Sequence, residues 1–381
     1  MSDDNVYIPK QDFDRLSRYS LRDKDILVSV VGTLGNAAIV TQKDLPAIFS
    51  CKSTVLRVFD INPEYLVVYL NSLYGKKLLL RRERGAIQKG LNLEDLKELD
   101  VFIPSVTFQN QIEKIFIVSL KSEQKSKRNY DQAKEILLKE IGFHEWVPNT
   151  TSIASQKSST VFNAKRFDAE FYQSKYKSIE QKIHSYRKGS CNIAEKFHLI
   201  KDNNLKNIKS SNYIEIGDIN IENGDYIFSN LLVKELPANA KITPHIGDIL
   251  VSKVRPNRGA VAIINDKINN LIVSGAFSVL REKSNFKKES LFVLLRTDIY
   301  KDLLLKWNVG TSYPVIKDED IMNLPIPLID NKIQEEISSL IQNSFQLRKE
   351  SDNLLELAKK AVEVAIEQGE EEAMKLLNDV L

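Results

Sequence analysis

Cysteine is almost absent from this 381-residue chain, which contains only Cys51 and Cys191. Two cysteines so far apart in sequence exclude a disulfide scaffold and a cysteine-based zinc site, and they fit a reduced compartment. No apolar run approaches the ~18 residues that a membrane-spanning helix needs. The first ten residues are polar and acidic, unlike a secretory signal. We therefore expect a cytoplasmic protein with no membrane partner.

The sequence is also poor in recognisable catalytic motifs. Its four histidines are scattered and suggest neither a metal cluster nor a catalytic triad: His144, His184, His198 and His245. The segment Asn62–Tyr65 comes nearest to the Asn-Pro-Pro-aromatic motif of adenine methyltransferases, but Glu64 replaces the second proline, and the start of a helix explains it better. No glycine-rich loop is followed by the Lys-Ser or Lys-Thr of a nucleotide-binding loop. We expect no catalytic residue, no metal and no bound cofactor.

Charge of one sign is not in large excess, because the net charge is only +3. Its distribution is uneven. Residues 331–381 carry 11 acidic and six basic residues, a net of −5, so the rest of the chain carries +8. A basic globular part joined to an acidic helical tail fits DNA binding by the first and protein contact by the second. A solvated acidic helix without a partner explains the charge equally well.

An internal repeat organises the chain. Six segments recur in the same order at offsets of 223 to 225 residues, and an early glutamine (Gln111, Gln334) then opens each long helical stretch. The matched segments are Asp25–Ser29 with Asp248–Ser252, Ala38–Val40 with Ala262–Ile264, Ile48–Ser50 with Ile272–Ser274, Val55–Arg57 with Val279–Arg281, Gly85 with Gly310, and Val101–Pro104 with Leu324–Pro327. One such match would arise by chance, but six in order would not.

Each copy has the same plan. Short runs of Val, Ile and Leu between Gly, Pro and Asn predict the strands of a small sheet. A helical piece follows, over 64–80 and 289–307, and then a long amphipathic helix over 110–141 and 331–369. The second copy begins earlier, with a helix expected over 166–186. The first domain is therefore N-terminally short, or another chain completes it.

These motifs, in this order and duplicated, resemble the specificity subunit of Type I restriction–modification enzymes, which defend cells against foreign DNA. The resembling residues are Gly247–Asn257, Ser274–Arg281, Gly310–Tyr313 and Leu324–Gln334 in the second copy, and Asp25–Val40, Ser50–Arg57, Gly85–Gly90 and Val101–Gln111 in the first. The resemblance implies an α+β protein. Two mixed α/β target recognition domains, the first N-terminally short, would be separated and joined by two long antiparallel coiled-coil-like helices.

The resemblance gives these elements boundaries and roles. We expect a partial first recognition domain at 1–107, a spacer helix at 108–142, a linker at 143–165, the second recognition domain at 166–330, and the second helix with its tail at 331–381. Each domain would read half of a bipartite target in double-stranded DNA. The helices would fix the spacing and dock DNA adenine methyltransferase subunits, which a restriction/translocase subunit joins for cleavage.

The chain itself would be non-catalytic, so S-adenosylmethionine, ATP and Mg would belong to the partner subunits. Two alternatives remain. One is a truncated or decoy subunit, an interaction protein that recognises one half-site or none. The other is a standalone nuclease, which nothing in the spacing of Asp, Glu and Lys favours.

The candidate DNA-binding residues of the second copy lie in two loops. The first loop carries Lys253, Arg255, Asn257 and Arg258 beside a proline. Arginine can bond guanine through two hydrogen bonds, asparagine can read adenine, and lysine suits phosphate. The second loop offers two hydroxyls and a ring, from Thr311, Ser312 and Tyr313. Alternatively, the first loop is a solvated turn whose arginines pair a carboxylate, and the second a turn with its tyrosine packed on the sheet.

In the first copy the candidates form one basic segment: Arg82, Arg84, Gln88 and Lys89. Such a segment can follow phosphates, and its binding would depend strongly on salt. The exposed end of a helix is the alternative explanation. The turn at 32–36 contains no cation, so we expect less of it.

Overall fold

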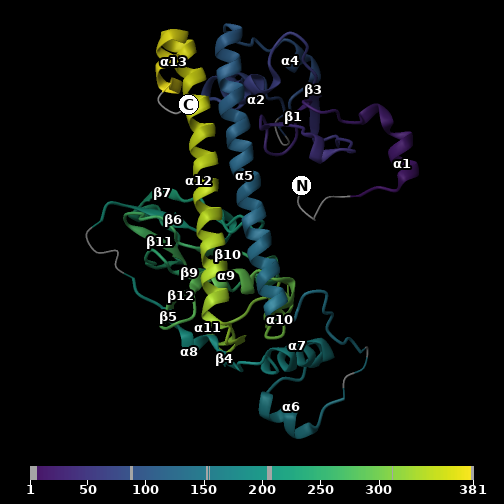
Figure 1. The fold of residues 1–381 in the computed structure, drawn as a ribbon, viewed down its shortest axis with the longest axis vertical. Coiled ribbons are helices and arrows are strands. Elements are labelled where there is room, and N and C mark those ends of the chain that lie inside the picture. Colours follow the sequence, from purple (N-terminus) through teal and green to yellow (C-terminus); the bar gives the residue numbers. More distant parts are fainter. Residues whose placement is uncertain are drawn as a thin grey trace. The chain divides into compact units, whose positions relative to one another are not determined.

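The computed structural model describes residues 7–85, 89–151, 153, 155–203, 208–310 and 312–378. The chain divides into two compact units: unit 1 consists of Met1–Lys125 with Gln346–Leu381, and unit 2 of Ser126–Phe345. Both contain helices and an antiparallel sheet, so the fold is α+β as the resemblance implied. The long helices α5 (Val106–Glu140) and α12 (Asn331–Gln368) each contribute one part to each unit (Figure 1). Within the described ranges, no helix is long and apolar enough to cross a membrane.

Unit 1 is built on a three-stranded antiparallel sheet of order β2-β1-β3. Its strands are β1 (Ile26–Ser29), β2 (Ala37–Ile39) and β3 (Ser53–Leu56), and its short helices are α1 (Lys10–Arg15), α2 (Pro63–Asn71), α3 (Leu73–Arg81), α4 (Leu93–Lys97) and α13 (Glu370–Asn378). Ile26 and Val28 alternate onto the buried face of β1, as a strand with one covered face requires. Apolar residues of α2, α5, α12 and α13 complete this core.

Unit 2 contains a larger version of the same sheet, of order β10-β9-β12-β5, and a second sheet of order β7-β6-β11-β8. The strands are β4 (Ser190–Asn192), β5 (Phe197–Ile200), β6 (Ser210–Ile214), β7 (Ser229–Leu232), β8 (Ala240–Ile242), β9 (Ile249–Ser252), β10 (Val261–Ile263), β11 (Leu271–Ser274), β12 (Phe277–Glu282) and β13 (Pro325–Pro327). The helices are α6 (Ser158–Ala164), α7 (Ser174–His184), α8 (Ile193–Lys196), α9 (Lys288–Leu295), α10 (Asp298–Leu305) and α11 (Asp318–Met322).

The sequence repeat is visible as a structural repeat, because β2-β1-β3 corresponds to β10-β9-β12 in order and pairing. The same ion pair ties each sheet together. Arg57 Nε donates to Asp25 at 2.7 Å in unit 1, and Arg281 Nε donates to Asp248 at 2.8 Å in unit 2. Both arginines bind their aspartate through two nitrogens. In the described part of unit 1, β5 and the second sheet have no counterpart, which agrees with a first domain that is shorter than the second.

The segments expected to be helical over 64–80 and 289–307 are helical, and each consists of two helices separated by a short break. The breaks fall at Ser72 and Thr297, whose side-chain oxygens accept the N–H groups of Gly75 (3.3 Å) and Tyr300 (3.4 Å). Such N-caps satisfy amide groups that a helix start leaves unpaired. Each cap therefore starts a new helix, α3 or α10, in a different direction.

The helices α5 and α12 pair in antiparallel fashion. In unit 1, Ser351 Oγ donates to the carbonyl of Ser119 at 2.9 Å. In unit 2, the hydroxyls of Ser126 and Ser344 each donate to the other residue's carbonyl, at 2.8 and 2.9 Å. Going forward along α5 thus means going backward along α12. Serine at these buried positions lets the two helices approach closely, with its hydroxyl satisfied across the contact.

A buried glutamine fastens each long helix to the loop before α2 in unit 1 and before α9 in unit 2. In unit 2, Gln334 accepts the N–H of Lys287 (2.8 Å) and donates to the carbonyl of Ile329 (2.9 Å). In unit 1, Gln109 accepts the N–H of Asn62 (3.0 Å) and donates to Pro104 O (2.9 Å). The counterpart of Gln334 is therefore Gln109, and the match to Gln111 was wrong because two nearby glutamines made the register ambiguous.

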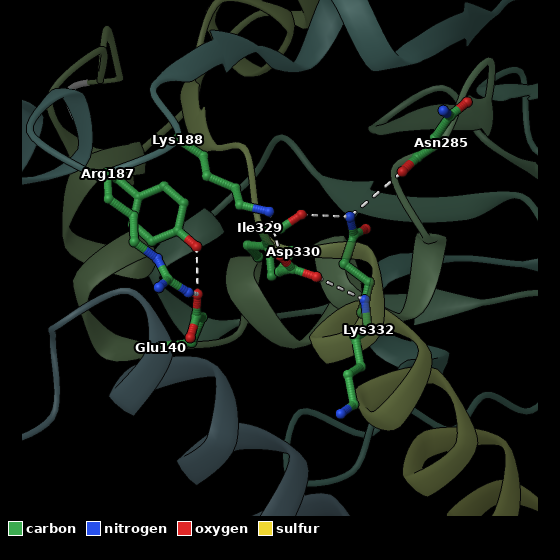
Figure 2. Close-up of polar contacts among 9 residues, drawn as sticks. Glu140, Arg187, Lys188, Asn285, Ile329, Asp330 and Lys332 are labelled. Carbon is green, nitrogen blue, oxygen red and sulfur yellow. Dashed lines mark hydrogen bonds and ion pairs between the residues drawn. The ribbon is translucent and has the colours of Figure 1, made fainter.

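Further polar contacts surround the start of α12 and the end of α5 in unit 2 (Figure 2). Lys188 forms an ion pair with Asp330, whose carboxylate also accepts the N–H of Lys332 at 3.0 Å. Glu140, the last residue of α5, accepts a hydrogen bond from Arg187 at 2.7 Å. These contacts hold both helix ends on the segment that leads into β4.

Candidate nucleic-acid interface

Two loops of unit 2 lie against each other: loop A (residues 253–259) and loop B (described residues 308–310 and 312–315). The Arg255 N–H donates to Pro314 O at 2.7 Å, and the Ile316 N–H donates to Lys253 O at 2.9 Å. Val254 and Val315 form an antiparallel bridge between them. The fold thus brings together the two candidate segments that the sequence places more than fifty residues apart.

The backbone of loop A forms a tight turn, and its long side chains point toward solvent. Arg255 (φ 50°) and Gly259 (φ 74°) have left-handed conformations on either side of a short 3₁₀ turn at Pro256–Arg258. For a non-glycine residue this conformation costs energy, and it tends to persist where the surroundings impose it. Here the bond to loop B imposes it. Arg255, Asn257 and Arg258 are all exposed.

Arg255 lies over the ring of Tyr313 from loop B, with its guanidinium carbon 5.3 Å from the ring centre. Tyr313 is itself exposed, with 46% of its surface accessible to solvent. Within the described residues, neither Arg255 nor Arg258 has a carboxylate partner. The interpretation of loop A as a turn neutralised by a nearby acid therefore finds no support, and two cations face outward.

Lys253 is placed differently from the other loop A candidates. Its side chain is only 17% exposed, and its ammonium binds Asp318 Oδ1 at 2.8 Å. Ser278 donates to the same oxygen. Burial raises the pKa of Asp318, but the hydrogen bonds from Lys253 and Ser278 outweigh burial and hold that pKa below its ordinary value. Asp318 is thus charged and orients Lys253 along the base of loop A.

Loop B is closed by a side chain that the sequence analysis did not single out. Asn308 Oδ1 accepts the N–H groups of Gly310 (2.8 Å) and Val315 (3.0 Å). A Cβ at position 310 would lie 1.9 Å from the carbonyl oxygen of Tyr313, so only glycine fits there. Ser312 is exposed, and Thr311 lies outside the described residues. The spacing Asn-x-Gly is a turn signal that would have pointed to Asn308.

Unit 1 repeats this arrangement of paired loops among its described residues, with residues 30–36 against residues 84–85 and 89–90. Val31 and Gly90 form an antiparallel bridge, as Val254 and Val315 do in unit 2. The Leu91 N–H donates to Val30 O at 3.0 Å, matching the bond from Ile316 to Lys253. The glycine-rich turn at 32–36 and the basic segment after α3 are therefore neighbours.

Three candidate cations of unit 1 are engaged in ion pairs. Arg82 binds Glu98, Arg84 binds Asp95, and Lys89 binds Glu83. The hydrogen bond from Arg84 to Asp95 raises the pKa of that guanidinium, although 66% of the side chain stays exposed. Gln88 lies outside the described residues. Compared with loop A, this basic surface carries its own neutralising acids.

Neither unit presents a site for metal chemistry in its described residues. No group of three or more His, Cys, Asp and Glu side chains is close enough to hold a metal ion there.

Comparisons with known proteins agree on one family. The family described as Type I restriction modification DNA specificity domain matches residues 4–135 and 187–357. The specificity subunit of the Type I restriction enzyme HindI from Haemophilus influenzae is 30% identical over 131 residues, and that of EcoBI from Escherichia coli is 31% identical over 96 residues. These matches cover 32% and 25% of this chain but only 28% and 20% of the relatives' own lengths.

The comparison with solved structures finds matches at low sequence identity. The S subunit of a Type I restriction–modification system from M. genitalium is 13% identical with a TM-score of 0.44, covering 95% of this chain and 84% of that one. The HsdS subunit from Thermoanaerobacter tengcongensis is 14% identical with a TM-score of 0.30, covering 92% of this chain and 82% of that one.

Proposed function

The chain belongs to the Type I restriction–modification DNA specificity family, and on this premise we propose that it reads a bipartite DNA target, one half with each unit. The observation that carries the proposal is the duplicated pair of loops. In unit 2 this pair exposes Arg255, Asn257 and Arg258 with no carboxylate partner among the described residues. Exposed, uncompensated cations beside an amide suit a surface that meets phosphates and base edges.

We assign the residues of unit 2 separate roles. Arg255 reads a guanine edge, because its stacking on Tyr313 fixes the plane of its guanidinium. Asn257 reads an adenine edge, and Arg258 contacts phosphate. Lys253 stays with Asp318 and holds the loop in place. From loop B, Thr311 and Ser312 contribute hydroxyls toward sugar, phosphate or base edges, and Tyr313 contributes the ring on which Arg255 stacks.

Unit 1 takes the other half-site through Arg82, Arg84, Gln88 and Lys89. Arg82, Arg84 and Lys89 must give up their ion pairs with carboxylates before they can bind phosphates, so each phosphate contact contributes less binding free energy than an unpaired cation would contribute.

These ion pairs favour a second candidate function. With a smaller sheet and a self-neutralised basic surface, unit 1 would recognise DNA weakly, and the chain would act as an interaction protein that reads one half-site.

The paired long helices are the proposed docking place for DNA adenine methyltransferase subunits. In unit 1 a groove of about 500 Å³ runs between α5 and α12, lined by Ile115, Val118, Leu354 and Leu357 among others. The remaining lining residues are polar or charged (Gln346, Lys349, Glu350 and Asn353), so the groove would suit a partner segment that carries both apolar and polar side chains. Methylation, and cleavage with a restriction subunit, would then be carried out by the partners, which bind S-adenosylmethionine, ATP and Mg. This chain would be non-catalytic.

Sequencing of DNA methylation in cells that express the cognate methyltransferase, with and without this gene, tests the proposal. A gapped, asymmetric adenine-methylation motif that appears only with the gene supports a subunit reading two half-sites. A motif with one recognised half supports the second candidate. Methylation that is the same with and without the gene contradicts both.

A further inference from the structure

We infer that Arg166, Asp168 and Asn308 form a brace that positions loop B for DNA reading. The inference rests on the proposed function, because it assigns these residues to the support of a proposed DNA-contacting loop. All three belong to unit 2. They act through loop B and are positioning residues, since none of them needs to touch DNA.

The brace begins at Arg166, in the segment between α6 and α7. Its Nε and Nη2 both donate to the carboxylate of Asp168, each at 2.7 Å. The guanidinium also lies 5.0 Å from the ring centre of Phe171, and only 18% of the side chain is exposed. A planar group held by two parallel bonds and an aromatic face has little freedom. Arg166 is therefore a rigid support.

This support reaches loop B through the backbone. Arg166 Nη2 donates a third bond, at 2.8 Å, to the carbonyl oxygen of Asn308. The ring of Phe171 packs edge-on against Trp307 at 5.1 Å, which holds the preceding residue as well. The start of loop B is thus tied to a segment that lies about 140 residues earlier in the sequence and belongs to neither recognition loop.

Asn308 then passes the constraint into the loop. Its side-chain oxygen accepts the N–H groups at both sides of the turn, Gly310 and Val315. The residues between them include Tyr313, on which Arg255 stacks. The bonds therefore run without interruption from Asp168 through Arg166 and Asn308 to the loop that carries the Tyr313–Arg255 pair. Freeing Arg166 would let Asn308, and with it the ring under Arg255, move.

Recognition of a base edge depends more strongly on a fixed position of loop B than binding of a phosphate does. Two bonds to a guanine edge require a fixed guanidinium plane, whereas phosphate contacts are longer-ranged and tolerate displacement. Loss of the brace should therefore lower binding to the preferred sequence and leave binding to arbitrary duplex nearly unchanged. A purely structural role would lower both together through loss of folded protein.

The test uses the full-length chain with the variants Arg166→Lys and Asn308→Ala. Lysine keeps the charge but loses the two-pronged bond and the plane, and alanine removes the oxygen that closes the loop. The matched control is Arg281→Lys, which breaks a similar two-pronged bond to Asp248 in the same unit, away from loops A and B. Two readouts are compared: hydrogen exchange of the amides at 309–316, and enrichment of sequences from a randomised duplex pool.

We expect both brace variants to speed exchange of the Gly310 and Val315 amides about tenfold or more, as local opening becomes easier. Affinity for the sequence that the wild type enriches should fall about two- to fivefold, no more than loss of the Tyr313 ring itself would cost, while affinity for the unselected pool stays nearly as in the wild type. The Arg281→Lys control should leave the loop B exchange and the specificity ratio as in the wild type, whatever its melting temperature.

Three results overturn the brace: loop B exchange unchanged in both variants, equal loss of specific and unselected binding, or the same pattern in the control. Failure of the proposed function looks different. If the wild-type chain itself enriches no sequence, the role in DNA reading falls with the proposed function.

Discussion

At the scale of single residues, substitutions of Tyr313 distinguish the role of its aromatic ring, on which Arg255 stacks, from the role of its hydroxyl. If the ring orients the arginine, Tyr313→Phe should bind DNA like the wild type, whereas Tyr313→Ala should lose the stacking. Such contacts at exposed sites are worth about 0.5–1 kcal/mol, so specific affinity should drop about two- to fivefold. Competition between the preferred duplex and unselected duplex measures this. Equal losses for Phe and Ala would show that the hydroxyl matters instead.

Asp318 gives a pH-dependent prediction at the same scale. Its pKa in the folded chain lies below the ordinary value because the bonds from Lys253 and Ser278 outweigh burial. A lowered folded-state pKa means that its stabilising contribution is complete well above about pH 4 and is lost as pH falls through that range and below. Asp318→Asn should therefore be less stable than the wild type at neutral pH, and the difference should shrink toward acid pH.

Urea unfolding at a series of pH values measures that difference. A gap between wild type and Asp318→Asn that stays constant from neutral to strongly acid pH would mean that the Lys253–Asp318 bond adds nothing to stability. It would also remove the reason to treat Lys253 as a support of loop A.

At the scale of elements, the buried glutamines that fasten α5 and α12 are the contacts that hold the helix starts. Replacing Gln334 or Gln109 by leucine leaves a partly buried backbone N–H and a buried carbonyl without their partner. Such unpaired groups cost about 1–3 kcal/mol. Each variant should unfold at correspondingly lower urea concentration. Gln111→Leu is the matched control, because the Gln111 side chain makes no hydrogen bond to the described residues, and it should unfold like the wild type.

The secondary-structure elements show which features of the fold can be predicted from the sequence. Alternating apolar residues and turn signals predicted the strands around 25–57 and 248–281 and the two long helices, because local periodicity determines which face is buried. The breaks at Ser72 and Thr297 were missed, since the caps lie inside continuous helical patterns. The register between Gln111 and Gln334 was wrong by two residues, because a buried side-chain contact, not the linear spacing, decides which glutamine corresponds.

For the candidate site the same distinction holds. The exposed cations of loop A were predictable, since a proline and a glycine beside three basic residues mark a surface turn. Three other features could not be predicted from the sequence. They are the ion pair of Lys253 with Asp318, the closure of loop B by Asn308, and the ion pairs of Arg82, Arg84 and Lys89. Each joins residues that only the tertiary fold brings together.

At the scale of the whole molecule, each unit has its own apolar core and its own pair of loops. The cores share no residue, so a substitution in the loops of one unit should leave the other unit's recognition intact, because independent sites behave additively. In the methylation motif, Arg255→Ala should relax one or two positions of one half, by about 1–3 kcal/mol of discrimination, and leave the gap and the other half unchanged.

The mirror experiment places Arg84→Ala in unit 1, where it should affect only the other half. It should do so more weakly, because Arg84 already has Asp95 as a partner. The double variant should show the sum of both effects in the sequenced motif. If Arg255→Ala alone blurs both halves, the two units do not read independently. If Arg84→Ala changes nothing while Arg255→Ala abolishes the whole motif, recognition rests on unit 2, and the chain reads one half-site.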